Sequence, residues 1–450
     1  MTSPGDHRSP AAGHDSFLPV IRRSMMGAIC SKLVAAEPKT VEGWSIQGHT
    51  EPDTRGVVSS DELLARARAL APRLRELQER TEADRRVPRE SFEALLDADL
   101  YRTLMPKRHG GFEHGLDAYV DVAFEIARGC GSTGWVHAIT STYQMLVAMY
   151  PLEAQDEVWG VNPRAISAAA FAPAGELAPV DGGYRLGGKW MFCSGVDNCD
   201  WVIVGSRVMA GENAGPADRG FALVPKADFA IEDNWHVVGL AGTGSKNISC
   251  TDVFIPAYRF ISVDDAGSGR PPGTLVNPAA LYTIPMFTVI SISVCAAIMG
   301  MAQGAYDEFV GGIRERITRG ASVTKAAPMA EIPAVQLRVG EARASIDAAR
   351  ALIDKDCKEL MATVSAGDEL GVDQRARFKG DQAFAARLAT EAVDLLFKGG
   401  GGGGLFTQSR MQRYWRDINA GAMHITMNRD VIGTFSGRIA LGLPPEFEQF

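Results

Sequence analysis

The hydrophobic pattern predicts an N-terminal domain made only of helices. Ser59 and Glu62 have the spacing of a capping box, in which two side chains bond to free N–H groups at a helix start. Leucines and alanines then recur at intervals of three and four residues, which places them on one helical face. Pro88 suits the first turn of a second helix. Two further helices are predicted over Asp117–Arg128 and Thr133–Met149.

After Pro163 the pattern changes to short runs with a period of two, which predicts a β-domain. Asp181-Gly182-Gly183 is a typical hairpin turn, and other turns with Gly, Asn and Pro follow it. We expect the strands to form a small barrel or a two-sheet structure. They are predicted at Trp201–Ser206, Gly220–Val224, Trp235–Val238 and Ile248–Phe254.

From about Asn277 the helical period returns, in segments longer than an average globular helix. Such segments favour a four-helix bundle. They cover Thr288–Arg319, Ile332–Ser365, Asp373–Lys398 and Thr407–Leu441.

These changes of pattern divide the chain into four parts. Residues 1–57 are rich in Pro, Gly, Ser and His and show little periodicity, so we expect a flexible extension; a short ordered arm is the alternative. The N-terminal helical domain is predicted over 58–162, the central β-domain over 163–275 and the C-terminal helical bundle over 276–450.

Composition narrows the class of protein. The 450 residues carry a net charge of −8, which argues against a nucleic-acid binder because such proteins usually present a basic surface. The seven cysteines form neither a CxxC pair nor a Cys/His cluster, so no metal site is predicted and we expect reduced thiols in the cytoplasm. We expect no membrane span: the most apolar stretch, Ile284–Met301, is interrupted by Pro285 and Gly300 and is predicted to be a buried helix.

Two segments of the β-domain are candidates for ligand binding. In Gly187–Gly195, aromatic side chains can lie against a planar ring, and the Ser194 hydroxyl can bond to the edge of a heterocycle; for Trp190 the alternative is a core position. In Gly242–Lys246, glycines permit close approach of a ligand and Lys246 supplies a cation. Arg259 adds a second cation suited to phosphate. A surface hairpin turn is the alternative for this second segment.

The C-terminal region contains a run of six glycines, Gly399–Gly404, and a lone histidine. Each glycine costs up to about 1 kcal/mol inside a helix, so the run predicts a loop between two helices. It either packs against a ligand or neighbouring subunit, or serves as a flexible linker. His424 lies in an apolar helical stretch, with Asn428 one turn further on the same face. The span Ile418–Met427 contains no carboxylate. A core histidine is the alternative to a catalytic one.

Together these motifs resemble the acyl-CoA dehydrogenase superfamily. The resemblance rests on the order of the domains, on the segments Lys189–Gly195 and Gly242–Lys246, and on Arg416-Asp417. The closing stretch from Asp417 to Arg438 resembles the two-component flavin monooxygenases of that fold, such as the oxygenase component of p-hydroxyphenylacetate hydroxylase and the secosteroid-phenol and aromatic polyketide hydroxylases. The resemblance covers roughly residues 60–450.

This resemblance implies an enzyme that receives reduced FMN (or FAD) from a separate NAD(P)H-flavin reductase. Such enzymes form a C4a-hydroperoxyflavin with O₂ and hydroxylate a phenolic ring. His424 would meet the substrate hydroxyl and favour its phenolate, because electrophilic attack needs an electron-rich ring. Tyr143 stands where several relatives carry a histidine near the flavin C4a. The residues implied to lie around the flavin, with Ser194 near N5, are Trp190, Phe192, Cys193, Ser194, Ser245, Lys246 and Arg259.

The superfamily resemblance further implies a homotetramer in which Gly400 and Gly401 complete a neighbour's flavin site. Three other functions stay open at this point. A true acyl-CoA dehydrogenase with bound FAD could take its base from Glu341 or Asp347. An N-oxygenase would use the same oxygen chemistry on an amine. A non-enzymatic flavin-binding or assembly protein is the third alternative.

Overall fold

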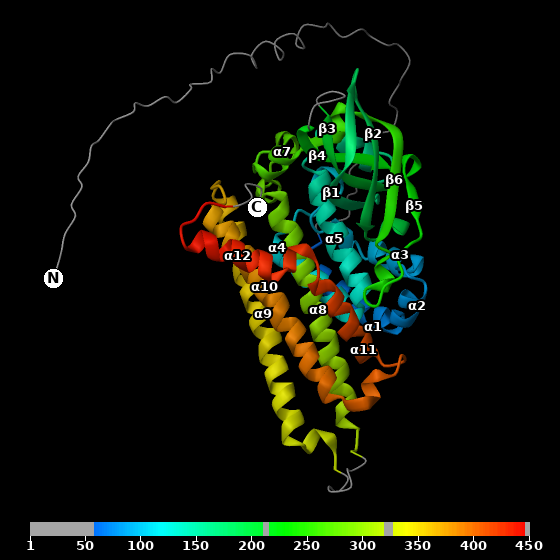
Figure 1. Ribbon diagram of the computed structural model, residues 1–450, viewed down its shortest axis with the longest axis vertical. Coiled ribbons are helices and arrows are strands. Elements are labelled where there is room, and N and C mark those ends of the chain that lie inside the picture. The colour runs from blue at the N-terminus through cyan, green and yellow to red at the C-terminus, as the bar shows by residue number, and fades with distance from the viewer. Residues whose placement is uncertain (1–57, 210–215, 319–326, 446–450) are drawn as a thin grey trace, which may run out of the picture. The chain divides into compact units, whose positions relative to one another are not determined.

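Helices, then strands, then long helices follow one another along the chain (Figure 1). This computed structural model describes residues 58–209, 216–318 and 327–445, so the predicted extension over 1–57 lies outside the described residues. The predicted class is confirmed: an N-terminal helical domain, a central β-domain and a C-terminal helical bundle.

The N-terminal helices pack against both the sheet and the long helices. As the capping pattern predicts, Ser59 Oγ accepts the N–H of Glu62 at 3.2 Å. Helix α5 is buried along its whole length, as expected for a helix enclosed on every side. It contacts α4, α8 and β1, so it lies between the sheet and the bundle (Figure 1). The helices are α1 (Ser60–Glu76), α2 (Gln78–Ala83), α3 (Arg89–Asp97), α4 (Leu116–Gly129), α5 (Gly131–Val147) and α6 (Leu152–Trp159).

The β-domain is one seven-stranded sheet with the order β5-β6-β2-β1-β3-β4-β7, so the expectation of a barrel or two sheets is wrong. All neighbouring strands are antiparallel except β1 and β3, which are parallel. The predicted strand at Trp235–Val238 is an irregular loop, because the Trp235 indole donates to the Leu240 carbonyl and folds this segment back on itself. The strands are β1 (Ser167–Val180), β2 (Gly183–Cys193), β3 (Trp201–Met209), β4 (Pro216–Pro225), β5 (Ala230–Glu232), β6 (Lys246–Pro256) and β7 (Phe260–Ser262).

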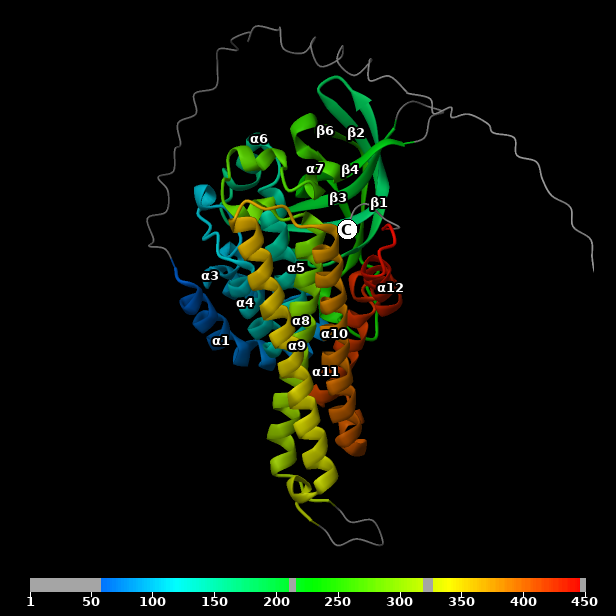
Figure 2. The same cartoon turned by 90° about the vertical axis from the view of Figure 1, so that its left-hand side faces the viewer.

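Three long helices run side by side in both views of the bundle: α8 (Met286–Arg314), α9 (Pro333–Ser365) and α10 (Val372–Gly399) (Figures 1 and 2). By length and composition α8 could cross a membrane, which corrects the expectation that no segment is apolar and long enough. However, 89% of its apolar stretch is buried inside the protein, as predicted for a core helix. The short helix α7 (Val263–Gly267) precedes it.

The fourth long helix predicted over Thr407–Leu441 is broken in two. Helix α11 (Arg410–Ala422) ends before His424, and α12 (Arg429–Ala440) starts after Asn428. The two side chains cap new helical turns: His424 accepts from the N–H of Thr426, and Asn428 accepts from two N–H groups of α12. Such local bonds compete with a continuous helix. His424 and Asn428 therefore do not share a helical face.

Candidate active site

A stripe of three residues on α5 connects the bundle to the sheet. Trp135, Ile139 and Tyr143 are four residues apart, so they lie on one face of the helix. The Trp135 ring meets the His424 ring edge-on at 5.8 Å, and the Tyr143 ring meets Phe171 of β1 edge-on at 5.5 Å. Two of the three predicted catalytic residues, His424 and Tyr143, therefore lie at opposite ends of this stripe, whose ends are about 12 Å apart along the helix axis. The third, Ser194, follows the end of β2.

The His424 imidazole is oriented by Thr426. Its Nδ1 accepts the main-chain N–H of Thr426 at 3.3 Å and lies 2.8 Å from Thr426 Oγ1. Burial lowers the pKa of His424 to about 4, so the ring is neutral near pH 7. With Nδ1 acting as acceptor, the proton of the neutral ring is on Nε2. Nε2 has no hydrogen-bond partner within the described residues, so this N–H can be donated to a ligand oxygen.

Tyr143 presents a neutral phenol. Its side chain is 5% exposed, and desolvation raises its pKa well above the ordinary value. Among the described residues its hydroxyl makes no hydrogen bond, whereas Tyr119 and Tyr150, on neighbouring segments, each donate to a main-chain carbonyl. The Tyr143 hydroxyl is therefore available as a donor to a ligand.

The end of β2 turns one aromatic ring outward and buries another. The pairing of β2 with β6 shifts register between Trp190 and Cys193, and Phe192 has a φ of 64° in the left-handed region. This bulge leaves Phe192 62% exposed, with its ring edge-on to Trp235 at 5.9 Å. Phe192 and Trp235 thus offer two ring surfaces to a planar ligand.

The prediction that Trp190 lies along such a ligand is wrong in this structure. Trp190 is fully buried, and its indole donates to the Gly205 carbonyl at 2.7 Å. The Cys193 side chain is also fully buried, so only its backbone can face a ligand. The core alternative therefore holds for Trp190, and Phe192 is the ring that remains accessible on this strand.

Ser194 and Ser245, which are 51 residues apart in sequence, are brought together at the ends of β2 and β6. Their Oγ atoms lie 2.6 Å apart, and Ser245 Oγ lies 2.7 Å from Thr243 Oγ1. Gly195 holds this turn against α5: a Cβ there would lie 2.7 Å from a methyl group of Val136. Ser194 is 7% exposed. The turn that carries Ser194 thus lies against α5, and a small part of Ser194 remains open to solvent.

Lys246 does not offer the free cation that was predicted for phosphate. Its Nζ lies 2.9 Å from Asp197 Oδ1 and 3.4 Å from Asp233 Oδ1, and its side chain is buried. Arg85 also pairs with Asp233 and, with Lys246, lowers the pKa of that carboxyl to about 2. Two carboxylates therefore already neutralise Lys246, and the cluster fastens the start of β6 to the N-terminal domain.

Arg259 is also displaced from the predicted site. It follows the far end of β6, about 30 Å from Lys246 for an extended strand of this length. There it pairs with Glu157 and lies over the Trp201 ring at 5.2 Å. Within one chain, Lys246 and Arg259 therefore cannot serve the same phosphate.

The glycine run connects α10 to α11, as predicted. Gly399 ends α10, and a 3₁₀-helix covers Gly401–Leu405. A Cβ at Gly401 would meet open space, and Gly401 has a φ of 62°. The run precedes α11 and His424 follows it, so the two are separated by about 20 Å of helix. Gly400 and Gly401 therefore lie away from the α5 stripe of their own chain.

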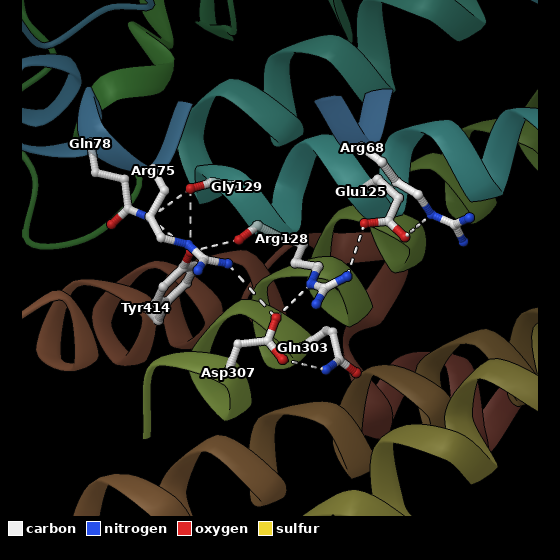
Figure 3. A network of polar contacts seen from close by, with 9 residues as sticks. All are labelled: Arg68, Arg75, Gln78, Glu125, Arg128, Gly129, Gln303, Asp307 and Tyr414. Atoms are coloured by element: carbon white, nitrogen blue, oxygen red, sulfur yellow. Dashed lines mark hydrogen bonds and ion pairs between the residues drawn. The ribbon is translucent and has the colours of Figure 1, made fainter. Parts of the chain in front are cut away.

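Helix α11 is fixed by a polar network that joins it to α1, α2, α4 and α8 (Figure 3). The Tyr414 hydroxyl donates to the carbonyl of Arg128 in α4 at 2.6 Å, and Gln78 of α2 donates to the Tyr414 oxygen at 2.7 Å. Arg128 in turn pairs with Asp307 of α8 at 2.5 Å. These bonds set the position of α11, and through it the position of His424 just beyond its end. No cluster that could hold a metal ion is found in the described ranges.

Comparison with known proteins identifies this arrangement. The model of the acyl-CoA dehydrogenase N-terminal domain matches residues 61–161, and that of the acyl-CoA dehydrogenase C-terminal domain matches residues 292–429. The chain is 38% identical over 389 residues to the FADH(2)-dependent resorcinol hydroxylase, oxygenase component, of Rhizobium sp. (strain MTP-10005), covering 85% of this chain and 95% of that protein.

Two solved structures are similar to this chain in both sequence and fold. The 3-HSA hydroxylase from Rhodococcus sp. RHA1 is 33% identical with a TM-score of 0.81, covering 86% of this chain and 99% of that one. XiaF from Streptomyces sp., solved in complex with FADH2 and glycerol, is 28% identical with a TM-score of 0.80, covering 87% and 98%. The chain therefore belongs to the acyl-CoA dehydrogenase superfamily, in its branch of flavin-dependent monooxygenase oxygenase components.

Proposed function

We propose that this protein is the oxygenase component of a two-component monooxygenase that hydroxylates a phenolic ring with reduced FMN or FAD and O₂. The observation that carries this proposal is the neutral His424, whose Nε2–H is free at one end of the α5 stripe. The bound flavin would supply the electrons and activate the oxygen. Binding and orientation of the substrate and exclusion of water are the tasks of the protein's own side chains.

Each group has a defined task. The His424 Nε2–H donates to the phenol oxygen and stabilises its anionic form, which enriches the ring in electrons. Phe192 and Trp235 would lie against a bound flavin ring, and Ser194 would bond to its edge. Tyr143, whose hydroxyl has no partner among the described residues, would donate to the reacting oxygen. Ile139 and the buried rings around Phe171 keep water out of this space.

The substrate class and the reductase are supported by the relatives. One relative is named for resorcinol, a phenol, and as an oxygenase component, which implies a separate flavin reductase. The dehydrogenase alternative is disfavoured by its candidate bases: Glu341 is exposed on α9, and Asp347 is exposed there and paired with Arg343 at 2.7 Å. Neither can reach a substrate enclosed beside α5.

A homotetramer in the cytoplasm is part of the same proposal. Beside the glycine run, Leu405 and Phe406 are 70% and 67% exposed, and next to His424, Met423 and Ile425 are 84% and 64% exposed. Apolar patches of this kind are typical of protein interfaces. Packing of the glycine run against a neighbour would place Gly400 and Gly401 beside that neighbour's flavin. The six cysteines within the described residues are buried free thiols, which suits a reducing compartment.

The test is a stopped-flow experiment. Anaerobic protein with photoreduced FMN is mixed with oxygenated buffer, first alone and then with a panel of phenols and amines. Passage through a transient absorbing species, followed by a hydroxylated phenol, is the expected result. Direct return of oxidised flavin without a transient, together with turnover of an acyl-CoA panel, would instead establish a dehydrogenase. Product from the amines alone would establish an N-oxygenase.

A further inference from the structure

Three hydroxyl groups form a chain that ends on a main-chain carbonyl. Thr243 Oγ1 donates to the Leu240 carbonyl at 2.8 Å. Ser245 Oγ lies 2.7 Å from Thr243 Oγ1, and Ser194 Oγ lies 2.6 Å from Ser245 Oγ. All three side chains are more than nine-tenths buried. At these distances each contact is a hydrogen bond rather than a meeting of lone pairs.

The Leu240 carbonyl fixes the direction of each hydroxyl proton in this series of three hydrogen bonds. A carbonyl can only accept, so the single hydroxyl proton of Thr243 is directed at Leu240. Thr243 must then accept from Ser245, which uses the only hydroxyl proton of Ser245. Ser245 in turn must accept from Ser194. The hydroxyl proton of Ser194 is therefore committed inward, and its open side presents lone pairs alone.

The Leu240 carbonyl, on which the three hydroxyl groups end, is itself held in place. Leu240 has a φ of 54°, and its carbonyl also accepts the N–H of Thr243 and the indole N–H of Trp235, each at 3.1 Å. Its own N–H donates to Asp417 Oδ1 at 2.6 Å. The carbonyl therefore cannot turn away from Thr243 without breaking several bonds.

We propose that Thr243 and Ser245 are positioning residues that make Ser194 an obligate acceptor, and that this selects reduced over oxidised flavin. This proposal rests on the proposed function. N5 of a reduced flavin carries a hydrogen and donates it, whereas N5 of an oxidised flavin is an acceptor. A Ser194 hydroxyl that can only accept forms a hydrogen bond with N5–H of reduced flavin. Against N5 of oxidised flavin, its lone pairs face the lone pair of the nitrogen. The selection suits an enzyme that must capture reduced flavin from a reductase and release it once oxidised.

The test measures the dissociation constants of both flavin forms on the intact protein. Oxidised FMN is titrated by fluorescence, and photoreduced FMN by anaerobic calorimetry. In Ser245→Ala and in Thr243→Val, the Ser194 proton becomes free to turn outward. Each variant should therefore bind oxidised FMN about two- to tenfold more tightly, as expected for one regained hydrogen bond. Ser245→Thr keeps a hydroxyl at this position and should retain the wild-type preference.

Ser194→Ala removes both effects, so it should weaken binding of reduced FMN about two- to tenfold and should not weaken binding of oxidised FMN, from which the opposing lone pairs have gone. The ratio of the two constants is measured within each variant, so a fraction of unfolded protein cancels. Weakening of both forms alike, or an unchanged ratio in both Ser245→Ala and Thr243→Val, would overturn the proposal. Failure of the wild-type protein to bind either form would instead reject the proposed function.

Discussion

Asp417 and Leu240 are joined by a hydrogen bond of 2.6 Å from the Leu240 main-chain N–H to Asp417 Oδ1. Leu240 is the residue on which the Ser194 hydroxyl chain ends, and Asp417 belongs to α11, the helix that precedes His424. One buried bond therefore fixes the turn of the β-domain that we propose to bind flavin relative to the end of the bundle that carries His424.

This bond leads to a prediction for pH. Burial raises the pKa of Asp417 to about 7, so between about pH 4 and 7 the folded protein holds a proton that the unfolded chain releases. The contribution of Asp417 to the free energy of unfolding should therefore fall as pH rises through this window. Asp417→Asn keeps an oxygen for Leu240 but removes this titration, so its melting temperature, measured by circular dichroism relative to that of the wild type, should rise with pH from about 4 to 7.

The matched control is Asp347→Asn on the exposed face of α9, which should follow the wild-type curve. Asp356, whose pKa burial also raises to about 7, keeps its falling contribution in Asp417→Asn, whereas His137 and His424, whose pKa values burial lowers to about 4, keep a rising one. Equal slopes in Asp417→Asn and the wild type would show that Asp417 titrates normally in the folded protein.

Phe192 combines backbone strain with an exposed ring, which gives opposite effects on stability and binding. Its φ of 64° is costly for a residue with a Cβ, so Phe192→Gly should leave the free energy of unfolding unchanged or raise it by up to about 1 kcal/mol. The same change removes the ring that we place against the flavin, so FMN affinity should fall. Met191→Gly, beside it on the same surface and without positive φ, should lower stability instead; a stable Phe192→Gly with full affinity would remove Phe192 from the site.

The positions of Trp190 and Phe192 illustrate what the sequence pattern alone cannot predict. In a regular strand these two positions share a face, so a period of two assigns both rings to one side. The register shift between Trp190 and Cys193 turns Phe192 outward, and such a bulge depends on pairing with β6, a partner 53 or more residues away. The domain order was readable because helical and strand periods are local signals. The bulge and the pairing of Ser194 with Ser245 arise from tertiary contacts. The break around His424 comes from local capping bonds, which the hydrophobic period does not reveal.

The same limit applies to Thr243 and Asp417, whose contacts include residues from other segments of the chain. Thr243 was visible only as a member of a glycine-containing loop, and nothing in its neighbourhood indicates that it ends a hydroxyl chain. Asp417 was part of the resembling motif, but its bond to Leu240 spans 177 residues. A cation such as Lys246 was visible, whereas the two carboxylates that neutralise it come from other segments.

Tyr143→Phe tests the role of an unpaired hydroxyl. Because this hydroxyl bonds to nothing within the described residues, its loss should change stability by less than about 0.5 kcal/mol. Release of hydrogen peroxide per reduced flavin should rise, since the reacting oxygen loses a donor. The control is Tyr119→Phe, which breaks a bond of 2.7 Å to the Ala138 carbonyl. It should cost about 1 kcal/mol and leave the peroxide yield unchanged. Equal peroxide yields in Tyr143→Phe and the wild type would exclude Tyr143 from the chemistry.

His424→Ala should keep flavin binding and the reaction of reduced flavin with oxygen, but lower hydroxylation by about 10²-fold or more, the usual range for a lost proton-handling group. Product is measured by chromatography against flavin oxidised. Because the His424 pKa is lowered to about 4 from 6.5, the wild-type yield should show no step from this residue near pH 6.5. Thr426→Val removes the shorter contact of Nδ1, that with Oγ1 at 2.8 Å, and leaves only the main-chain N–H at 3.3 Å to orient the ring, so it should cause a partial loss. Full product yield from His424→Ala would refute the proposed role.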